Sequence, residues 1–290
     1  MSTPTTWTGI RASTSAELLR LRKWPAVWVT VGAWMALAAM FGYVFNYVSY
    51  ATGDSSFSND GASTGSLLAQ VLPANVPSVL IQGTPMFGGA LMMVLGALVA
   101  GSGYSWGTWK TVFLQGPSRT SAGAGSLVAL TLAVVGLIVA TLAMCFALSL
   151  GIAALESQTV VWPDGGELLR SVGIAFAVLE MWSLAGFLLG TLARGPALSV
   201  GLGLVWALVI ENLLRGVGAL LSPVEAFTRV MPGTAAGSLV GSLVGVEPGG
   251  DGTPGVIDTL SAGQATGTLA AYVVLLPVVA LWLMRRRDVA

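Results

Sequence analysis

The chain has 290 residues, of which 54% are hydrophobic and only 9% are charged, and its mean hydropathy is +0.81. Because a soluble domain carries about 25% charged residues, this composition excludes an ordinary soluble protein and indicates an integral membrane protein. Thirteen basic residues balance thirteen acidic ones, so the net charge does not indicate a nucleic-acid partner. The lack of histidine and the single cysteine, Cys145, exclude histidine-based acid–base chemistry, His/Cys metal sites and an intrachain disulfide.

Residues 1–24 are predicted to form a cytoplasmic or interfacial helix. Thr14-x-x-Glu17 has the pattern of a capping box, which predicts that a short helix begins there and runs up to the first apolar segment. Arg20 and Arg22 would then be available to lipid headgroups. Because Arg22 falls within the apolar arc of this helix, a plain cytoplasmic flank is the alternative.

Six apolar segments are long enough to cross a membrane as helices, because about 20 helical residues span the ~30 Å hydrocarbon layer. Neither a solenoid repeat nor an inverted repeat is visible, so we expect one all-α membrane domain over residues 1–290. The spans are predicted at residues 25–47, 85–101, 124–155, 169–193, 197–221 and 264–284.

Two long connections lie on the acidic side of these spans. Residues 49–84 contain two aspartates and no basic residue, and their apolar part is too short and too rich in proline to cross. We expect an outside loop there, with room for a surface helix. Residues 223–246 are semi-apolar and are broken at Pro232-Gly233, which predicts a pair of re-entrant or interfacial helices before the last span.

The basic residues predict the orientation. Ten of the thirteen fall on the side of the two chain ends, so the positive-inside rule predicts a multi-pass protein of the cell membrane with both termini in the cytoplasm. The ten are Arg11, Arg20, Arg22, Lys23, Lys110, Arg119, Arg194, Arg285, Arg286 and Arg287.

The segment 102–121 is predicted to be a cytoplasmic loop, because it carries two basic residues and no acid between two spans. Trp106, Trp109 and Phe113 recur at helical spacing, so a short helix over 106–114 with one aromatic, apolar face is expected to lie at the membrane surface and to dock onto a partner. A tethering loop with interfacial aromatic residues and no partner is the alternative.

This segment resembles the first cytoplasmic loop of ABC-2 type permeases. The resemblance is carried by Tyr104-x-Trp106-Gly107-Thr108-Trp109-Lys110-Thr111, followed by Gly116-Pro117-Ser118-Arg119. In that family the loop holds a coupling helix that contacts a separate ATP-binding subunit, and an extracellular helical hairpin precedes the last span. The coupling residues implied for this chain are Trp106, Gly107, Thr108, Trp109, Lys110 and Phe113.

The resemblance implies a permease subunit of an ATP-driven exporter that works by alternating access with a second permease subunit and separate ATPase subunits. The glycines near Lys110 lack the GxxxxGK[ST] order of a phosphate-binding loop, so ATP and Mg²⁺ are expected on the partner ATPase and no cofactor on this chain. The alternative from another class is an ATP-independent channel, or a structural or sensory membrane protein.

Two acidic residues inside the spans are candidates for a substrate pathway. Glu180 lies near the middle of the fourth span, and Glu211 lies with Asn212 in the outer half of the fifth. Membrane-embedded acids are costly and often functional. Glu211 could instead pair with Arg215 one turn later, and Glu180 could instead make an interhelical hydrogen bond.

Glycines in the second and fourth spans predict a close helix–helix contact, since small residues let backbones approach. They are Gly88, Gly89 and Gly96 in one span and Gly186-x-x-x-Gly190 in the other.

Overall fold

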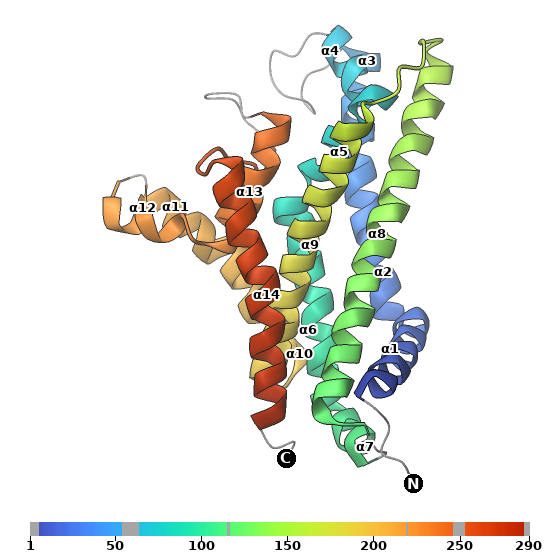
Figure 1. The fold of residues 1–290 in the computed structure, drawn as a ribbon. Helices are drawn as coiled ribbons and strands as arrows, with labels where there is room; N and C mark the ends of the chain where they lie inside the picture. The colour runs from blue at the N-terminus through green and yellow to red at the C-terminus, as the bar shows by residue number, and fades with distance from the viewer. Residues whose placement is uncertain (1–5, 54–63, 115–116, 219, 246–252, 287–290) are drawn as a thin grey trace.

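The computed structural model describes residues 6–53, 64–114, 117–218, 220–245 and 253–286, and all regular structure in these ranges is helical (Figure 1). Six helices are long and apolar enough to cross a membrane, which confirms the six predicted spans. They run Pro25–Thr52, Thr84–Ser105, Arg119–Leu155, Gly165–Ala193, Pro196–Gly218 and Ala262–Arg286.

Three of the spans are continuous α-helices and three contain a π-helical stretch. The continuous ones are α8 (Arg119–Leu155), α9 (Gly165–Ala193) and α14 (Ala262–Arg286). The first span joins α2 (Pro25–Ala39), η1 (Met40–Val44) and α3 (Phe45–Thr52); the second joins η4 (Thr84–Gly88) and α6 (Gly89–Ser105); the fifth joins α10 (Pro196–Leu204), η5 (Val205–Ile210) and α11 (Glu211–Gly218).

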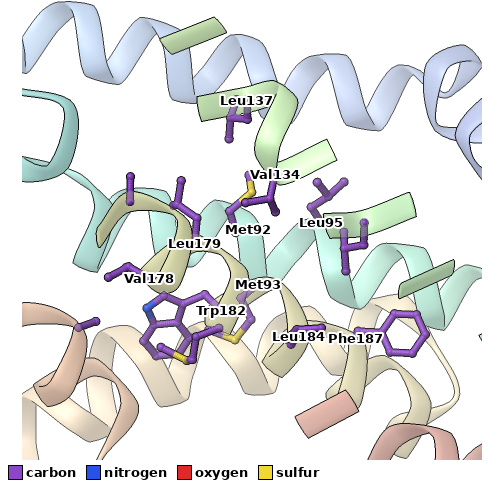
Figure 2. Close-up of a cluster of buried hydrophobic side chains, with 14 of the residues drawn as sticks. Met92, Met93, Leu95, Val134, Leu137, Val178, Leu179, Trp182, Leu184 and Phe187 are labelled. Atoms are coloured by element: carbon purple, nitrogen blue, oxygen red, sulfur yellow. The ribbon is translucent and has the colours of Figure 1, made fainter. Parts of the chain in front are cut away.

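The second and fourth spans form the centre of the bundle, where α6 packs directly on α9. A Cβ atom added at Gly96 would overlap Ser183 O, and one added at Gly186 would overlap Met93 O. These glycines therefore bring the two backbones into contact, as predicted. Around this crossing, side chains of α6, α8 and α9 form the main hydrophobic cluster, which Figure 2 labels as Met92, Met93, Leu95, Val134, Leu137, Val178, Leu179, Trp182, Leu184 and Phe187.

A second hydrophobic cluster lies toward the C-terminal end of α8. At ~1.5 Å per residue, the 37 residues of α8 extend about 55 Å, well beyond a ~30 Å hydrocarbon layer. Its C-terminal part packs with α3, α4 (Thr64–Val71) and α5 (Val76–Gln82) around buried Tyr43, Val71, Val76, Cys145 and Ile152.

Within residues 49–84, the prediction of a surface helix is therefore wrong for α5, which packs into the bundle. Val76, Leu80 and Ile81 are buried. The prolines of this segment lie at the starts of its short helices. Pro73 and Pro77 are in first turns, where a backbone N–H has no partner within the helix and its absence costs nothing.

The N-terminal helix begins before the predicted capping box. α1 covers Thr6–Lys23, and Thr14 lies in its middle, where its hydroxyl donates to Ile10 O at 2.9 Å. The predicted capping box is therefore wrong, because Thr14 satisfies its hydroxyl within the helix instead of accepting from free backbone N–H groups at a helix start.

The segment before the last span is broken as predicted. α12 (Ser222–Thr228) and α13 (Pro232–Val244) are separate helices, and Pro232 begins the second one. The described part of α13 is buried over Gly233–Gly241, against α14 and the second span, whereas α11 and α12 extend to one side of the bundle (left in Figure 1).

Candidate functional site

The loop between the second and third spans contains the predicted short helix. α7 covers Thr108–Leu114 and begins after Gly107, whose φ of +65° lies in the left-handed region that glycine adopts without strain. Figure 1 shows α7 at the same end of the bundle as α1 and the last turn of α14. The loop thus lies at the end of the bundle that also holds the basic residues of α1 and of the last turn of α14.

Trp109 faces the chain's own core. Its side chain is 6% exposed, and its Nε1 donates to Ala100 O in α6 at 3.3 Å. The ring stacks on Phe113 at a centroid distance of 5.6 Å and lies on Gly103, where a Cβ atom would overlap it. The prediction that Trp109 turns outward to a partner is therefore wrong, because α6 already buries its ring and accepts the indole N–H, whereas Phe113 is half-buried and its role stays a prediction.

The outward surface of this segment consists of other residues. Trp106 is 63% exposed and Leu114 is 88% exposed, and Lys110 and Thr111 are exposed between them. We call Trp106, Lys110, Thr111 and Leu114 the outward α7 surface. An exposed Trp and an exposed Leu beside a lysine could anchor a partner, since aromatic and apolar side chains at a contact centre supply most of its binding energy.

The N-terminal helix and α7 are attached to the same turn of α6. Arg20 of α1 donates to Val99 O at 3.1 Å. The next carbonyl along α6, that of Ala100, accepts the hydrogen bond from Trp109. The ring of Trp24 also meets the ring of Trp106 edge-on, with centroids 5.7 Å apart. These contacts could not be predicted from the sequence, because nothing in the local pattern links α1 to residues about 80 positions later.

Glu180 lies buried between α9 and α8. Thr131 Oγ1 of α8 donates to its Oε1 at 2.6 Å, and Ser183 Oγ donates to the Glu180 backbone carbonyl at 2.8 Å. The interhelical hydrogen bond, one of the two predicted alternatives for Glu180, is therefore confirmed. It gives the carboxylate one polar partner on the neighbouring span.

Glu211 is fully buried where the fifth span meets α13. Trp206 Nε1 donates to its Oε1 at 2.9 Å. Its Oε2 lies against Gly233 in the first turn of α13, so closely that a Cβ atom there would overlap it. Met231, the residue before α13, provides no side-chain cap for this helix. The Glu211 carboxylate lies at the N-terminus of α13, where the helix dipole favours negative charge.

The predicted helical pairing of Glu211 with Arg215 is not formed as a salt bridge. Arg215 instead donates to Asn212 Oδ1 at 2.7 Å, and Asn212 Nδ2 donates to Leu208 O at 2.9 Å. The reason is geometric: Glu211 is buried against Gly233 of α13, while Asn212 is exposed and Arg215 is half-buried on α11. Glu211 and Asn212 are adjacent in the sequence and were predicted to form one site, but their side chains point in different directions.

Across the described ranges, no three acidic or cysteine side chains come together as a metal site would need. The chain matches no protein-family model and no curated protein. Membership of the ABC-2 type permeases therefore stays a prediction, and the outward α7 surface and the two buried acids are the candidate sites that the geometry defines.

Proposed function

We propose that this chain is the transmembrane permease subunit of an ATP-driven exporter of the ABC-2 type, working by alternating access with a separate ATP-binding subunit and a second permease subunit. The observation that carries the proposal is the outward α7 surface. It lies between the second and third spans, at the end of the bundle where α1 and the last turn of α14 lie.

The proposal includes the orientation in the cell membrane. Exposed basic residues occur in α1, in α7 and at the end of α14. At the opposite end, Glu156 and Asp164 lie between the third and fourth spans, and Glu167 lies in the first turn of the fourth. The positive-inside rule then favours both termini in the cytoplasm. In this orientation α1 is an interfacial helix, α7 faces the ATPase, and the α12–α13 hairpin is the extracellular, re-entrant one.

An ATPase that seats on α7 would transmit its closure to the centre of the bundle through existing contacts. Trp109 connects α7 to the Ala100 carbonyl of α6, and α6 crosses α9 at the Gly96 and Gly186 contact. Movement of α7 would therefore displace the second and fourth spans together, near the buried carboxylate of Glu180.

Copurification tests the proposal. The chain is expressed with each ATP-binding protein encoded beside its gene and is purified through a tag on the chain. Leu114→Asp places a charge in the outward α7 surface, and the matched control Leu155→Asp changes a leucine that is 75% exposed at the opposite end of α8. Because a buried Leu or Trp anchor contributes about 2 kcal/mol, we expect Leu114→Asp and Trp106→Ala each to weaken the complex about 30-fold or more.

The control should retain the ATPase at the yield of the unchanged chain. If no neighbouring gene product binds, or if both aspartate variants bind equally well, the chain is not such a subunit. An ATP-independent channel or a structural or sensory protein would then be the better assignment.

The pathway role of Glu180 is tested by transport. Glu180→Gln keeps the side-chain shape and the acceptor for Thr131 Oγ1 but removes the charge. A loss of transport with Glu180→Gln, while Thr131→Val retains it, would support a cargo role. Equal retention by both variants would leave Glu180 with only its interhelical hydrogen bond.

A further inference from the structure

The N-terminal helix α1 lies along the side of the bundle, at the level where the second span ends and the third begins. Leu21 is buried, and Arg20 reaches Val99 O in α6. Ser13 and Thr14 pack against Gly125 of α8, where a Cβ atom would come within 2.9 Å of the Thr14 backbone nitrogen. One face of α1 is therefore occupied by the protein itself.

The opposite face of α1 is exposed and basic. Successive turns present the exposed side chains of Trp7, Arg11, Ser15 and Leu19, and Arg22 follows at the end of the same face with Lys23 beside it. Arg11 and Arg22 are about 16 Å apart along the helix at ~1.5 Å per residue. We call Trp7, Arg11, Ser15, Leu19, Arg22 and Lys23 the outer α1 face.

The outer α1 face has no acidic counterpart on its own helix. Glu17 is the single acid in α1; it lies partly buried on the inner side and forms an ion pair with Arg20. Burial raises the pKa of the Glu17 carboxyl above its ordinary value, although the charge of Arg20 opposes this shift. The three cations on the outer face are thus left for a partner outside α1.

The junction with the first span places this face at headgroup level. α2 begins at Pro25, directly after Trp24, and the exposed Trp28 donates from Nε1 to Arg22 O at 2.8 Å. Tryptophans collect at the boundary between headgroups and acyl chains. Arg22 and Lys23 therefore lie beside the tryptophan that begins the membrane-crossing part of the chain.

We propose that the outer α1 face binds anionic phospholipid headgroups. The three bases would contact lipid phosphates, and Trp7 and Leu19 would insert at the acyl boundary, which is how basic interfacial helices bind membranes. Zwitterionic lipids offer no net charge to three cations, so the binding is selective for acidic lipids. The inference does not depend on the proposed exporter function.

Fluorescence quenching in vesicles tests this inference with the full chain. Ser15→Cys, in a Cys145→Ser background, carries a fluorophore in the middle of the outer α1 face. Two vesicle preparations contain the same mixture of phosphatidylglycerol and phosphatidylcholine, and they differ only in which of the two lipids carries the bromine quencher. Both leaflets have the same composition, so the orientation of the inserted chain does not affect the comparison.

We expect stronger quenching by brominated phosphatidylglycerol at low salt, and loss of the difference at high salt, where charges are screened. Local enrichment should fall about fivefold for each base removed, so Arg11→Gln/Arg22→Gln/Lys23→Gln should abolish it. The control Arg285→Gln/Arg286→Gln removes charges from the same end of the bundle and should retain it. Equal quenching by the two lipids in the chain with its native bases would overturn the inference, whether or not the triple variant folds.

Discussion

Replacing Trp109 with alanine tests whether this side chain packs into the chain's own core or is available to bind a partner. The change removes a buried indole, its hydrogen bond to Ala100 O and its stacking on Phe113. Truncating a buried tryptophan costs about 3–5 kcal/mol. At roughly 2 °C for each kcal/mol in a chain of this size, the midpoint of thermal unfolding should fall by about 6–10 °C.

Trp106→Ala makes the same substitution three positions earlier and should have a different result. Trp106 is mostly exposed, and its one aromatic contact in the described structure is the edge of Trp24. Such a ring pair is worth about 0.5–1.5 kcal/mol, so the midpoint should fall by at most about 3 °C.

Heating the purified chain in detergent, followed by size-exclusion chromatography of the protein that stays monodisperse, measures both midpoints. Copurification of the ATPase is the second measurement. Per folded chain, Trp106→Ala should recover less ATPase than Trp109→Ala. A Trp109→Ala variant that unfolds at the temperature of the unchanged chain would refute the placement of this ring in the core.

Three further predictions use the same preparations or intact cells. Gly186→Ala should lower stability by about 1–3 kcal/mol, because the added methyl group meets the backbone of α6, whereas Gly173→Ala on the same helix has no atom within 4 Å and should be neutral or slightly stabilising; equal effects would contradict the close contact. In a chain without its native cysteine, Asp164→Cys should react with a membrane-impermeant thiol reagent in intact cells and Ser118→Cys should not; the reverse would invert the orientation. Glu211→Leu should cost about 1–3 kcal/mol, because it leaves the Trp206 indole N–H without its acceptor and removes a negative charge from the N-terminus of α13. Lost transport at full stability would instead indicate a pathway role.

The six spans could be predicted from the sequence because hydropathy and length are local properties. A charge-free apolar segment of about 20 residues has to bury its backbone polar groups in a helix wherever it enters a bilayer. The break at Pro232-Gly233 and the glycines at positions 96 and 186 could also be predicted, since each depends on the residue type itself. Boundaries were less exact: α8 begins at Arg119, because Ser118 caps it, five residues before the apolar segment starts.

The tertiary structure decided which faces and partners those elements use. Trp109 packs on Gly103 of α6 and donates to the Ala100 carbonyl, so its side chain is buried, whereas Trp106 and Leu114 are exposed. Glu211 lies at the start of α13 instead of beside Arg215. A periodic pattern gives the direction of one side chain relative to another on the same helix, but which direction is the interior depends on helices that are distant in the sequence.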